Sequence, residues 1–344
     1  MKTQAAVLCA LNQPLEIMDL GIPKLAKGQV LVEIAYSGIC RTQLNEIKGY
    51  KGHDPYLPHT LGHEGSGIVL EIGPDVSKVN VGDHVVLTWI KGSGIDAGGC
   101  KYISQNGVVN SGAISTFMNY SIISENRLVP IPNNLPLREA ALLGCAIPTG
   151  AGIVFNQLKL SKGSSCAVFG TGGIGLSAIL AARFLGANPI IAIDISDTKL
   201  EQAVVLGATH IINAKLSNVT EKIQEYTRGK GVEGVIESAG HNEAMEMAYQ
   251  STALRGTCIL AGNLPKGQKI QIDPFDLILG KTVKGSWGGE SRIDEDIAQY
   301  VPMLIDSKLK LDKLITHEIH LNDINNLLED LQDAKVGRGI IAFC

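Results

Sequence analysis

The sequence predicts an α/β protein of two domains, one mostly β and barrel-like, the other built on a doubly wound parallel sheet. Three observations support this prediction. The chain has 344 residues, which exceeds the usual size of a single domain. Short apolar segments separated by Gly and Pro fill the first 130 residues. From about residue 147 to residue 286, short apolar segments instead alternate with helix-like ones, as in parallel sheets.

The expected elements follow from residue composition and from the Gly and Pro residues that separate the segments. In the first part, β-forming residues predict strands at 30–36, 67–73 and 82–87, bounded by turn residues such as Gly73-Pro74. In the second part, the expected strands are 165–169, 190–193, 210–213, 234–237 and 257–261. Helix-like stretches lie between them, at 174–186 and 199–207. The remaining expected elements are helices at about 293–307 and 321–334 and a closing strand at 339–343.

Composition excludes several classes of protein. With 45% hydrophobic and 19% charged residues, the chain can bury a large core and is not a disordered sequence. The net charge of -4, without a Lys/Arg cluster, argues against nucleic acid as a partner. The apolar run near the start breaks at Asn12-Gln13-Pro14, too short for a signal peptide or membrane span, so no membrane association and a cytoplasmic location are expected.

The glycine-rich turn Gly170-Thr171-Gly172-Gly173-Ile174-Gly175 follows an expected strand and opens an expected helix. Gly170 would make the tight turn, Gly172 would admit a pyrophosphate and Gly175 would let helix and strand pack closely. Asp194 ends the next strand, where an acid would bind the ribose hydroxyls and repel a 2′-phosphate, so NAD is expected over NADP. The alternatives are that Asp194 caps the following turn and that Lys199, a possible ribose contact, is a solvated surface residue.

Seven cysteines, an odd number, are scattered without paired spacing, so disulfides are not expected and a special cysteine would be a thiolate ligand or nucleophile. Cys40 ends an expected strand, His63 lies in Gly62-His63-Glu64, and Cys145 ends a helix-like run. Two thiolates and an imidazole form a catalytic zinc set with one open position. Their spacing alone does not establish such a site. From the residues alone, each Cys is better explained as a small buried apolar residue and His63 as a core or turn histidine.

The segment from Gly62 to Val76 matches the pattern G-H-E-x-x-G-x5-G-x-x-V, and further matching motifs are GICRT (38–42), LLGCAIPTG (142–150), CAVFGTGGIGL (166–176) and KGSW (284–287). In these motifs the chain resembles the zinc-dependent alcohol dehydrogenases of the medium-chain dehydrogenase/reductase superfamily. The resemblance implies a GroES-like catalytic domain formed by residues 1–146 and 287–344 and a Rossmann NAD-binding domain at 147–286. It also implies hydride transfer between an alcohol, or its aldehyde or ketone, and NAD, with zinc stabilising the alkoxide.

The resemblance further assigns roles to individual residues. Cys40, His63 and Cys145 match the three catalytic zinc ligands, and Glu64 matches an acid that can approach the metal in some relatives. Thr42 matches the hydroxyl that accepts the alcohol proton. The remaining matches are Arg41 and Arg338 toward the cofactor pyrophosphate, Thr149 near the nicotinamide, and Trp89 in the substrate pocket or, alternatively, in the core.

The chain departs from the family pattern at three places. Gln43 replaces an Asp that supports the ligands, and Asn45 replaces a His that accepts the relay proton. The lobe at 91–112 has a single cysteine, Cys100, and cannot form the four-cysteine structural zinc site of relatives. One zinc per subunit is therefore expected. The expected assembly is a homodimer formed through the nucleotide-binding domains, with a tetramer as the alternative.

Two other functions remain open at this stage. One is a zincless NAD(P)H-dependent quinone or enone reductase of the same superfamily, against which Cys40, His63, Cys145 and Asp194 argue. The other is an NAD-binding protein without catalysis, which Gln43 and Asn45 keep open, although the three matched ligands and Thr42 argue against it. Among substrates, a primary or small secondary alcohol is favoured over a long polyol, while sugar-like alcohols and biosynthetic aldehydes stay open.

Overall fold

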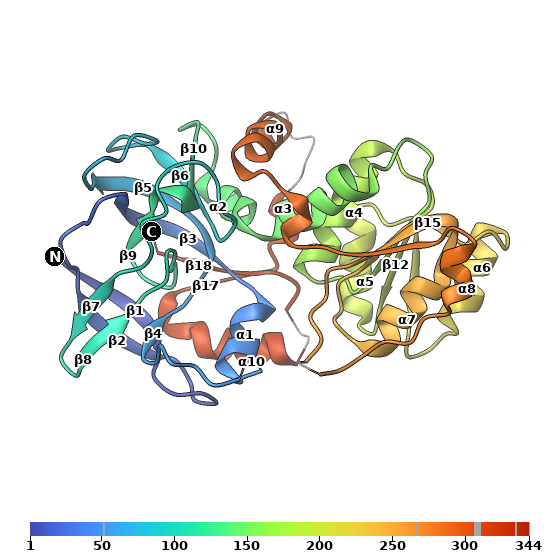
Figure 1. Ribbon diagram of the computed structural model, residues 1–344, viewed down its shortest axis with the longest axis horizontal. Coiled ribbons are helices and arrows are strands. Elements are labelled where there is room, and N and C mark those ends of the chain that lie inside the picture. Colours follow the sequence, from blue (N-terminus) through green and yellow to red (C-terminus); the bar gives the residue numbers. More distant parts are fainter. Residues whose placement is uncertain (51, 266, 306–310, 334–335, 344) are drawn as a thin grey trace. The chain divides into compact units, whose positions relative to one another are not determined.

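The computed structural model describes residues 1–50, 52–265, 267–305, 311–333 and 336–343 (Figure 1). The chain forms two compact units. Unit 1 consists of Met1–Cys145, Arg292–Ser307 and Ile315–Cys344, and unit 2 consists of Ala146–Ser291 and Lys308–Leu314.

Unit 1 is mainly β structure, as predicted for the first part of the chain. A closed barrel contains, in spatial order, β1 (Lys2–Leu8), β2 (Glu16–Gly21), β7 (Lys101–Ser104), β8 (Gly107–Asn110) and β4 (His59–Thr60). A seven-stranded sheet has the order β10 (Leu128–Ile131), β6 (His84–Thr88), β5 (Glu64–Ile72), β3 (Gln29–Ile39), β18 (Gly339–Ala342) and β17 (His317–Ile319), with β9 (Tyr120–Ser124) also paired to β3. Strands are present where they are expected, at 30–36, 67–73, 82–87 and 339–343, although their ends differ by a few residues.

Strand β3 organises the sheet of unit 1. Its β-branched residues Val30, Val32 and Ile34 are buried in one cluster with side chains of β5 and β6. Because such residues favour extended backbone and gain stability on burial, they account for the length of β3. β3 pairs antiparallel with β5 and with β18, so the last strand of the chain lies beside one that ends near residue 39. This pairing brings residues far apart in sequence to the same end of the sheet.

Unit 1 is not purely β structure, because it also contains helices, of which the one that follows β3 was not predicted. A short helix, α1 (Arg41–Ile47), begins directly after β3, where Leu44 and Ile47 pack into the core. The other helices are α2 (Leu137–Ala140), continued by a 3₁₀ turn at Ala141–Gly144, α9 (Ile293–Ile305) and α10 (Ile324–Gln332). The predicted helix ends at 306–307 and 334 lie outside the described residues.

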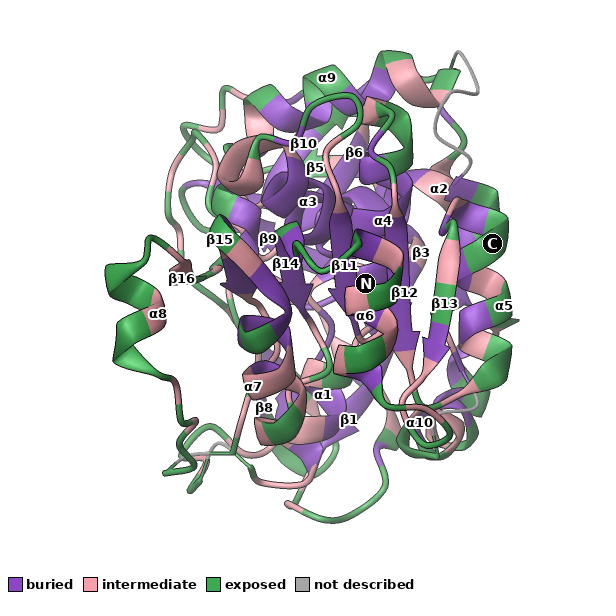
Figure 2. Ribbon diagram, turned by 90° about the vertical axis from the view of Figure 1, so that its right-hand side faces the viewer, coloured by how far each residue is buried: buried purple, intermediate pink, exposed green. Residues whose placement is uncertain are grey.

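Unit 2 is a doubly wound parallel sheet, as predicted. The strand order is β13 (His210–Asn213), β12 (Ile190–Asp194), β11 (Cys166–Phe169), β14 (Val232–Glu237), β15 (Thr252–Leu260) and β16 (Thr282–Gly285), and all neighbours are parallel. The helices are α3 (Ala146–Gly152), α4 (Gly173–Leu185), α5 (Asp197–Leu206), α6 (Val219–Thr227), α7 (Asn242–Ser251) and α8 (Pro274–Ile278). Figure 2 shows that the central strands β11, β12 and β14 are largely buried, as expected for parallel strands covered on both faces.

Among the described residues, no single helix is long and apolar enough to cross a membrane. One bent pair of helical segments, Leu137–Gly144 and Ala146–Leu158, meets the requirements of length and composition when taken together.

Candidate metal and cofactor sites

Cys40, His63 and Cys145 come together in unit 1, with one potential ligand atom from each lying within 4.8 Å of the others. Cys40 follows β3 and His63 precedes β5, and the antiparallel pairing of Ser37 with Gly65 brings these two strand ends together. Cys145 follows the 3₁₀ turn that ends at Gly144. A Cβ atom at Gly144 would lie 2.1 Å from the Leu87 carbonyl oxygen, so only glycine lets this turn approach the sheet so closely.

The electrostatics of this cluster suit a cation. The Nε2 atom of His63 is buried and has no hydrogen-bond partner within the part of the chain that the structure describes. The thiol of Cys145 and the imidazole of His63 hold the pKa of Cys40 well below its usual range, although burial opposes this shift. Two sulfur atoms and one ring nitrogen with few competing partners form a donor set that fits zinc, with a fourth position open.

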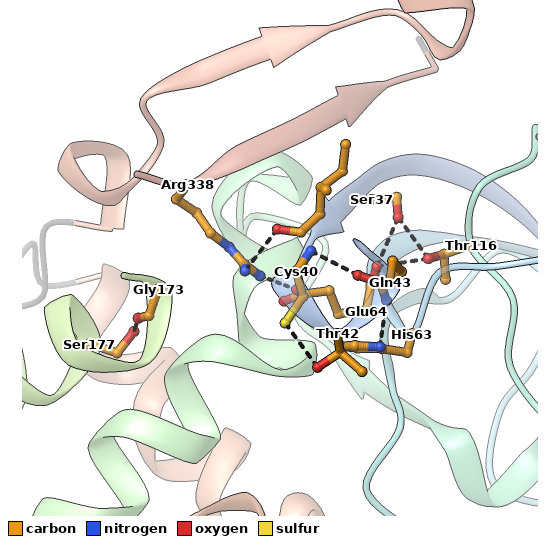
Figure 3. A network of polar contacts seen from close by, with 11 residues as sticks. Ser37, Cys40, Thr42, Gln43, His63, Glu64, Thr116, Gly173, Ser177 and Arg338 are labelled. Carbon is orange, nitrogen blue, oxygen red and sulfur yellow. Dashed lines mark hydrogen bonds and ion pairs between the residues drawn. The ribbon is translucent and has the colours of Figure 1, made fainter. Parts of the chain in front are cut away.

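Two further predicted residues lie beside this cluster. The Thr42 hydroxyl oxygen is 3.6 Å from the Cys40 sulfur. A dashed line marks this contact in Figure 3. The Trp89 ring meets the His63 ring edge-on, with centroids 6.5 Å apart and an interplanar angle of 67°. Arg41, by contrast, is exposed at the start of α1.

Glu64 and Arg338 form an ion pair between the Glu64 Oε1 and Arg338 Nη2 atoms. Both residues are buried, and Arg338 also donates to the Ile39 carbonyl oxygen at 3.1 Å. Burial raises the pKa of Glu64, and the positive charge of Arg338 offsets this only in part. Glu64 is not in the group of three potential ligands, and the approach of Glu64 to a metal and of Arg338 to a cofactor both stay predictions.

A supporting network of hydroxyl groups was missed by sequence reasoning. Ser37 and Thr116 both donate to the Glu64 carbonyl oxygen, at 3.1 and 3.0 Å, and their own oxygens are 2.7 Å apart (Figure 3). These bonds fix the backbone next to His63. No signal in the sequence marks the two residues, because isolated Ser and Thr residues are common in strands.

The glycine-rich turn in unit 2 has the backbone that its sequence predicts. Gly170 has a φ of +86°, and a Cβ there would lie 2.6 Å from the Ala239 nitrogen. A Cβ on Gly175 would lie 2.0 Å from the Gly170 carbonyl oxygen, so this glycine is required for close packing of α4. A Cβ on Gly172 would meet nothing within 4 Å, which leaves space in front of the helix N-terminus at Gly173 and Ile174.

Asp194 ends β12 beside this turn. One carboxylate oxygen accepts bonds from the Thr171 backbone nitrogen and hydroxyl, at 2.7 and 2.9 Å. The other accepts from the backbone nitrogens of Ile195 and Ser196, at 2.7 and 3.1 Å. Asp194 therefore orders the glycine turn and caps the following turn, which was the structural alternative considered for it.

The other residues proposed for cofactor binding differ in exposure. Lys199 is partly buried on α5. Thr149 is buried on α3, and its hydroxyl oxygen has no hydrogen-bond partner among the described residues. A ligand hydroxyl or amide that reached Thr149 would satisfy this atom.

Cys100 precedes β7 and packs partly buried against two apolar clusters of unit 1. Burial raises the pKa of its thiol to about 11, so the thiol stays protonated at neutral pH. This environment suits a packing residue better than a metal ligand or nucleophile.

Comparison with known proteins gives consistent matches for both parts of the chain. Residues 26–133 match the family model of the alcohol dehydrogenase GroES-like domain, and residues 173–306 match that of the zinc-binding dehydrogenases. The chain is 31% identical to an S-(hydroxymethyl)glutathione dehydrogenase of Paracoccus denitrificans, with 100% of each chain covered. A similar protein of Synechocystis sp. is 32% identical, again with full coverage.

Solved structures agree with these matches. The benzyl alcohol dehydrogenase of Acinetobacter calcoaceticus has 32% sequence identity and a TM-score of 0.91, with 100% of each chain covered. An alcohol dehydrogenase zinc-binding domain protein of Burkholderia ambifaria has 34% identity and a TM-score of 0.93, with 99% of each chain covered.

Proposed function

The chain belongs to the zinc-binding alcohol dehydrogenases, and we propose that it transfers a hydride between an alcohol and NAD, with Cys40, His63 and Cys145 holding a catalytic zinc. The observation that carries the proposal is that Cys40, His63 and Cys145 each bring one potential ligand atom within 4.8 Å of the others. In addition, the buried Nε2 atom of His63 has no hydrogen-bond partner among the described residues. Unit 1 serves as the catalytic domain and unit 2 as the NAD-binding domain.

When bound, zinc supplies a Lewis acid that favours loss of the alcohol proton, and NAD supplies the hydride acceptor. The residues of the chain position the reactants. Thr42, whose hydroxyl lies 3.6 Å from the Cys40 sulfur, would accept a hydrogen bond from the substrate hydroxyl and, on taking up that proton, pass its own proton on toward solvent. Trp89, edge-on to His63, forms an apolar wall that orients the carbon chain of the substrate and excludes water.

The cofactor-binding role is assigned to the glycine turn of unit 2. The space in front of Gly172 and the N-terminus of α4 accept the pyrophosphate. The negative charge of Asp194 at the end of β12 disfavours a 2′-phosphate, which supports NAD over NADP. Arg41, Lys199, Thr149 and Arg338 are assigned as further cofactor contacts.

The substrate class that fits this site is a small primary alcohol or its aldehyde. A large aromatic side chain, Trp89, next to a ligand residue narrows the space near the metal. The relatives named above include a benzyl alcohol dehydrogenase and S-(hydroxymethyl)glutathione dehydrogenases, which supports a primary alcohol. One zinc per subunit is proposed, because Cys100 is the single cysteine of the 91–112 lobe. The cytoplasmic location expected from the sequence stays a prediction.

We propose a homodimer formed through unit 2, with a tetramer as the alternative. Among the described strands, β16 pairs only with β15 and is an edge of the sheet, which a second copy could extend. Large apolar side chains of this region are exposed, with 60% for Phe275, 78% for Ile278 and 82% for Trp287. Ile278→Lys should therefore reduce the mass of the assembly measured by light scattering.

The test of the proposed function is zinc content measured beside NAD reduction with a series of alcohols. About one zinc per chain and alcohol-dependent NAD reduction are expected, both lost in Cys40→Ser and Cys145→Ser. Cys100→Ser is the matched control and should keep both, because Cys100 packs in apolar clusters away from the ligands. A protein without zinc, or one in which Cys40→Ser keeps its zinc and activity, would contradict the proposal.

A further inference from the structure

The side chain of Gln43 connects two of the three proposed zinc ligands. Gln43 lies on α1 and is only 2% exposed. Its Oε1 atom accepts a bond of 2.8 Å from the backbone nitrogen of Cys40. Its Nε2 atom lies 2.5 Å from the Nδ1 atom of His63. Figure 3 draws both contacts of the Gln43 amide as dashed lines. One buried amide group therefore contacts both residues.

The orientation of this amide follows from chemistry. The backbone N–H of Cys40 can only donate, so the amide oxygen of Gln43 must be the atom that faces it. The amide nitrogen then faces His63, and it also can only donate. Turning the amide over would place two donors against each other at Cys40.

This orientation determines where His63 carries its proton. Because the Gln43 nitrogen donates, His63 Nδ1 must accept, and the neutral ring then has its proton on Nε2. Nε2 is the buried ring nitrogen for which the described residues provide no hydrogen-bond partner. A metal binds to an unprotonated ring nitrogen, so binding through Nε2 moves the proton to Nδ1 and makes Nδ1 a donor. Two donors, from Gln43 and His63, would then face each other.

We propose that Gln43 is a positioning residue that holds His63 in the tautomer which zinc binding must reverse. Zinc loading then requires the Gln43 amide to turn over or to give up one of its two hydrogen bonds, and this weakens zinc binding. The proposal rests on the proposed function in one respect, that His63 is a zinc ligand. The tautomer itself is a property of the metal-free protein.

The variant Gln43→Glu distinguishes this idea from a merely structural role. A glutamate has the same length, and its two oxygens can accept from both the Cys40 N–H and a His63 Nδ1–H. Zinc affinity should rise by about 10- to 100-fold, the scale of supporting contacts to metal ligands. Gln43→Met should not reproduce this gain, because its thioether sulfur is only a weak acceptor for the N–H groups of Cys40 and His63.

A charge control is available on the same helix. Asn45→Asp adds one negative charge two positions further along α1, and residues two apart do not share a helix face. It should change zinc affinity much less than Gln43→Glu. An equal gain in both variants would mean that charge alone acts, and would overturn the proposal.

The experiment has two parts, made on the full chain with its cysteines kept reduced. In the first, two-bond ¹H–¹⁵N NMR spectra of the metal-free protein report the His63 tautomer, assigned by comparison with His63→Asn. The Nε2–H form is expected in the wild type and the Nδ1–H form in Gln43→Glu. An Nδ1–H form in the metal-free wild type would overturn the proposal, whatever the metal does.

The second part measures zinc affinity by competition with a coloured chelator for the wild type, Gln43→Glu, Gln43→Met and Asn45→Asp. If the wild type binds one zinc that Cys40→Ser loses, but Gln43→Glu binds it no more tightly, the inference about Gln43 fails and the proposed function stands. If no variant binds zinc at this site, the proposed function fails, and the NMR spectra still decide the tautomer.

Discussion

The guanidinium group of Arg338 forms a buried ion pair with the carboxylate of Glu64, a residue 274 positions away in the sequence. Arg338 precedes β18, and Glu64 begins β5. Arg338 also donates to the carbonyl oxygen of Ile39, the last residue of β3. The pair therefore connects the start of β5, the end of β3 and the residue before β18, next in sequence to Cys40 and His63.

Removing one member of this pair should destabilise the fold strongly. Glu64→Gln leaves an uncompensated buried guanidinium and should lower the free energy of unfolding by about 3–5 kcal/mol, measured by urea denaturation. The matched control is Arg138→Ala, which removes two ion pairs, with Glu139 and with Glu318; the three side chains are 32%, 21% and 40% exposed. The control should cost no more than about 1 kcal/mol. Equal losses in the two variants would contradict the importance of burial.

Substitutions at two glycines of the cofactor turn should have different effects, one on NAD affinity and the other on the stability of the fold. Gly172→Ala places a methyl group in open space, so the free energy of unfolding should stay within about 0.5 kcal/mol of the wild type, while NAD binds more weakly. Gly175→Ala drives a Cβ to 2.0 Å from the Gly170 carbonyl oxygen and should destabilise the fold itself. Thermal unfolding and NAD titration on both variants check this. Unchanged NAD affinity in Gly172→Ala would count against the assigned phosphate site.

Glu125 should contribute to stability in a pH-dependent manner. This buried carboxylate accepts bonds from the backbone nitrogens of Ser77, Lys78 and Ile95, at 2.7, 2.9 and 2.7 Å. Burial opposes ionisation, but these bonds outweigh it and lower the pKa of Glu125 in the folded state. Its contribution is therefore fully present above the unfolded pKa of about 4.3 and is lost as the pH falls through the lower folded value.

The variant Glu125→Gln tests the direction of this pH dependence. It should lower the free energy of unfolding by about 1–3 kcal/mol at neutral pH, because the amide has one acceptor oxygen fewer. The difference from the wild type should shrink as the pH falls below about 4.3. Glu71→Gln, at an exposed strand position, is the control and should show little difference at any pH. A difference for Glu125→Gln that grew on acidification would refute the argument.

Loss of the Thr42 hydroxyl should lower kcat/KM without changing the zinc content. Thr42→Val keeps the shape of the side chain but removes the hydroxyl group that lies 3.6 Å from the Cys40 sulfur. The kcat/KM for alcohol oxidation should fall by about 10²- to 10⁴-fold, the usual range for a proton-transfer group, while zinc content stays at the wild-type value. Thr42→Ser restores the hydroxyl and should recover most of the activity. If Thr42→Val lost its zinc, its effect would be structural rather than on proton transfer.

Much of unit 2 could be predicted from local sequence. The strands at 166–169 and 190–194, the turn from Gly170 to Gly175 and helix α4 all lie close to their predicted positions. Each depends on contacts between near neighbours in the chain, so residue type and spacing carry the information. In unit 1 the same reasoning found strands but missed α1, because a seven-residue helix after a strand leaves almost no periodic pattern.

The sequence by itself determined the residue types of both sites: two thiols and an imidazole in unit 1, and a glycine turn with an acid at the next strand end in unit 2. Only the tertiary structure decided that Cys40, His63 and Cys145 meet within 4.8 Å. It also decided that Arg338 pairs with Glu64 and that Gln43 bridges Cys40 and His63. The physical reason is that strand pairing and packing against the sheet fix these contacts: β3 between β5 and β18, and the Gly144 turn close against Leu87. No local pattern of residues encodes such distances.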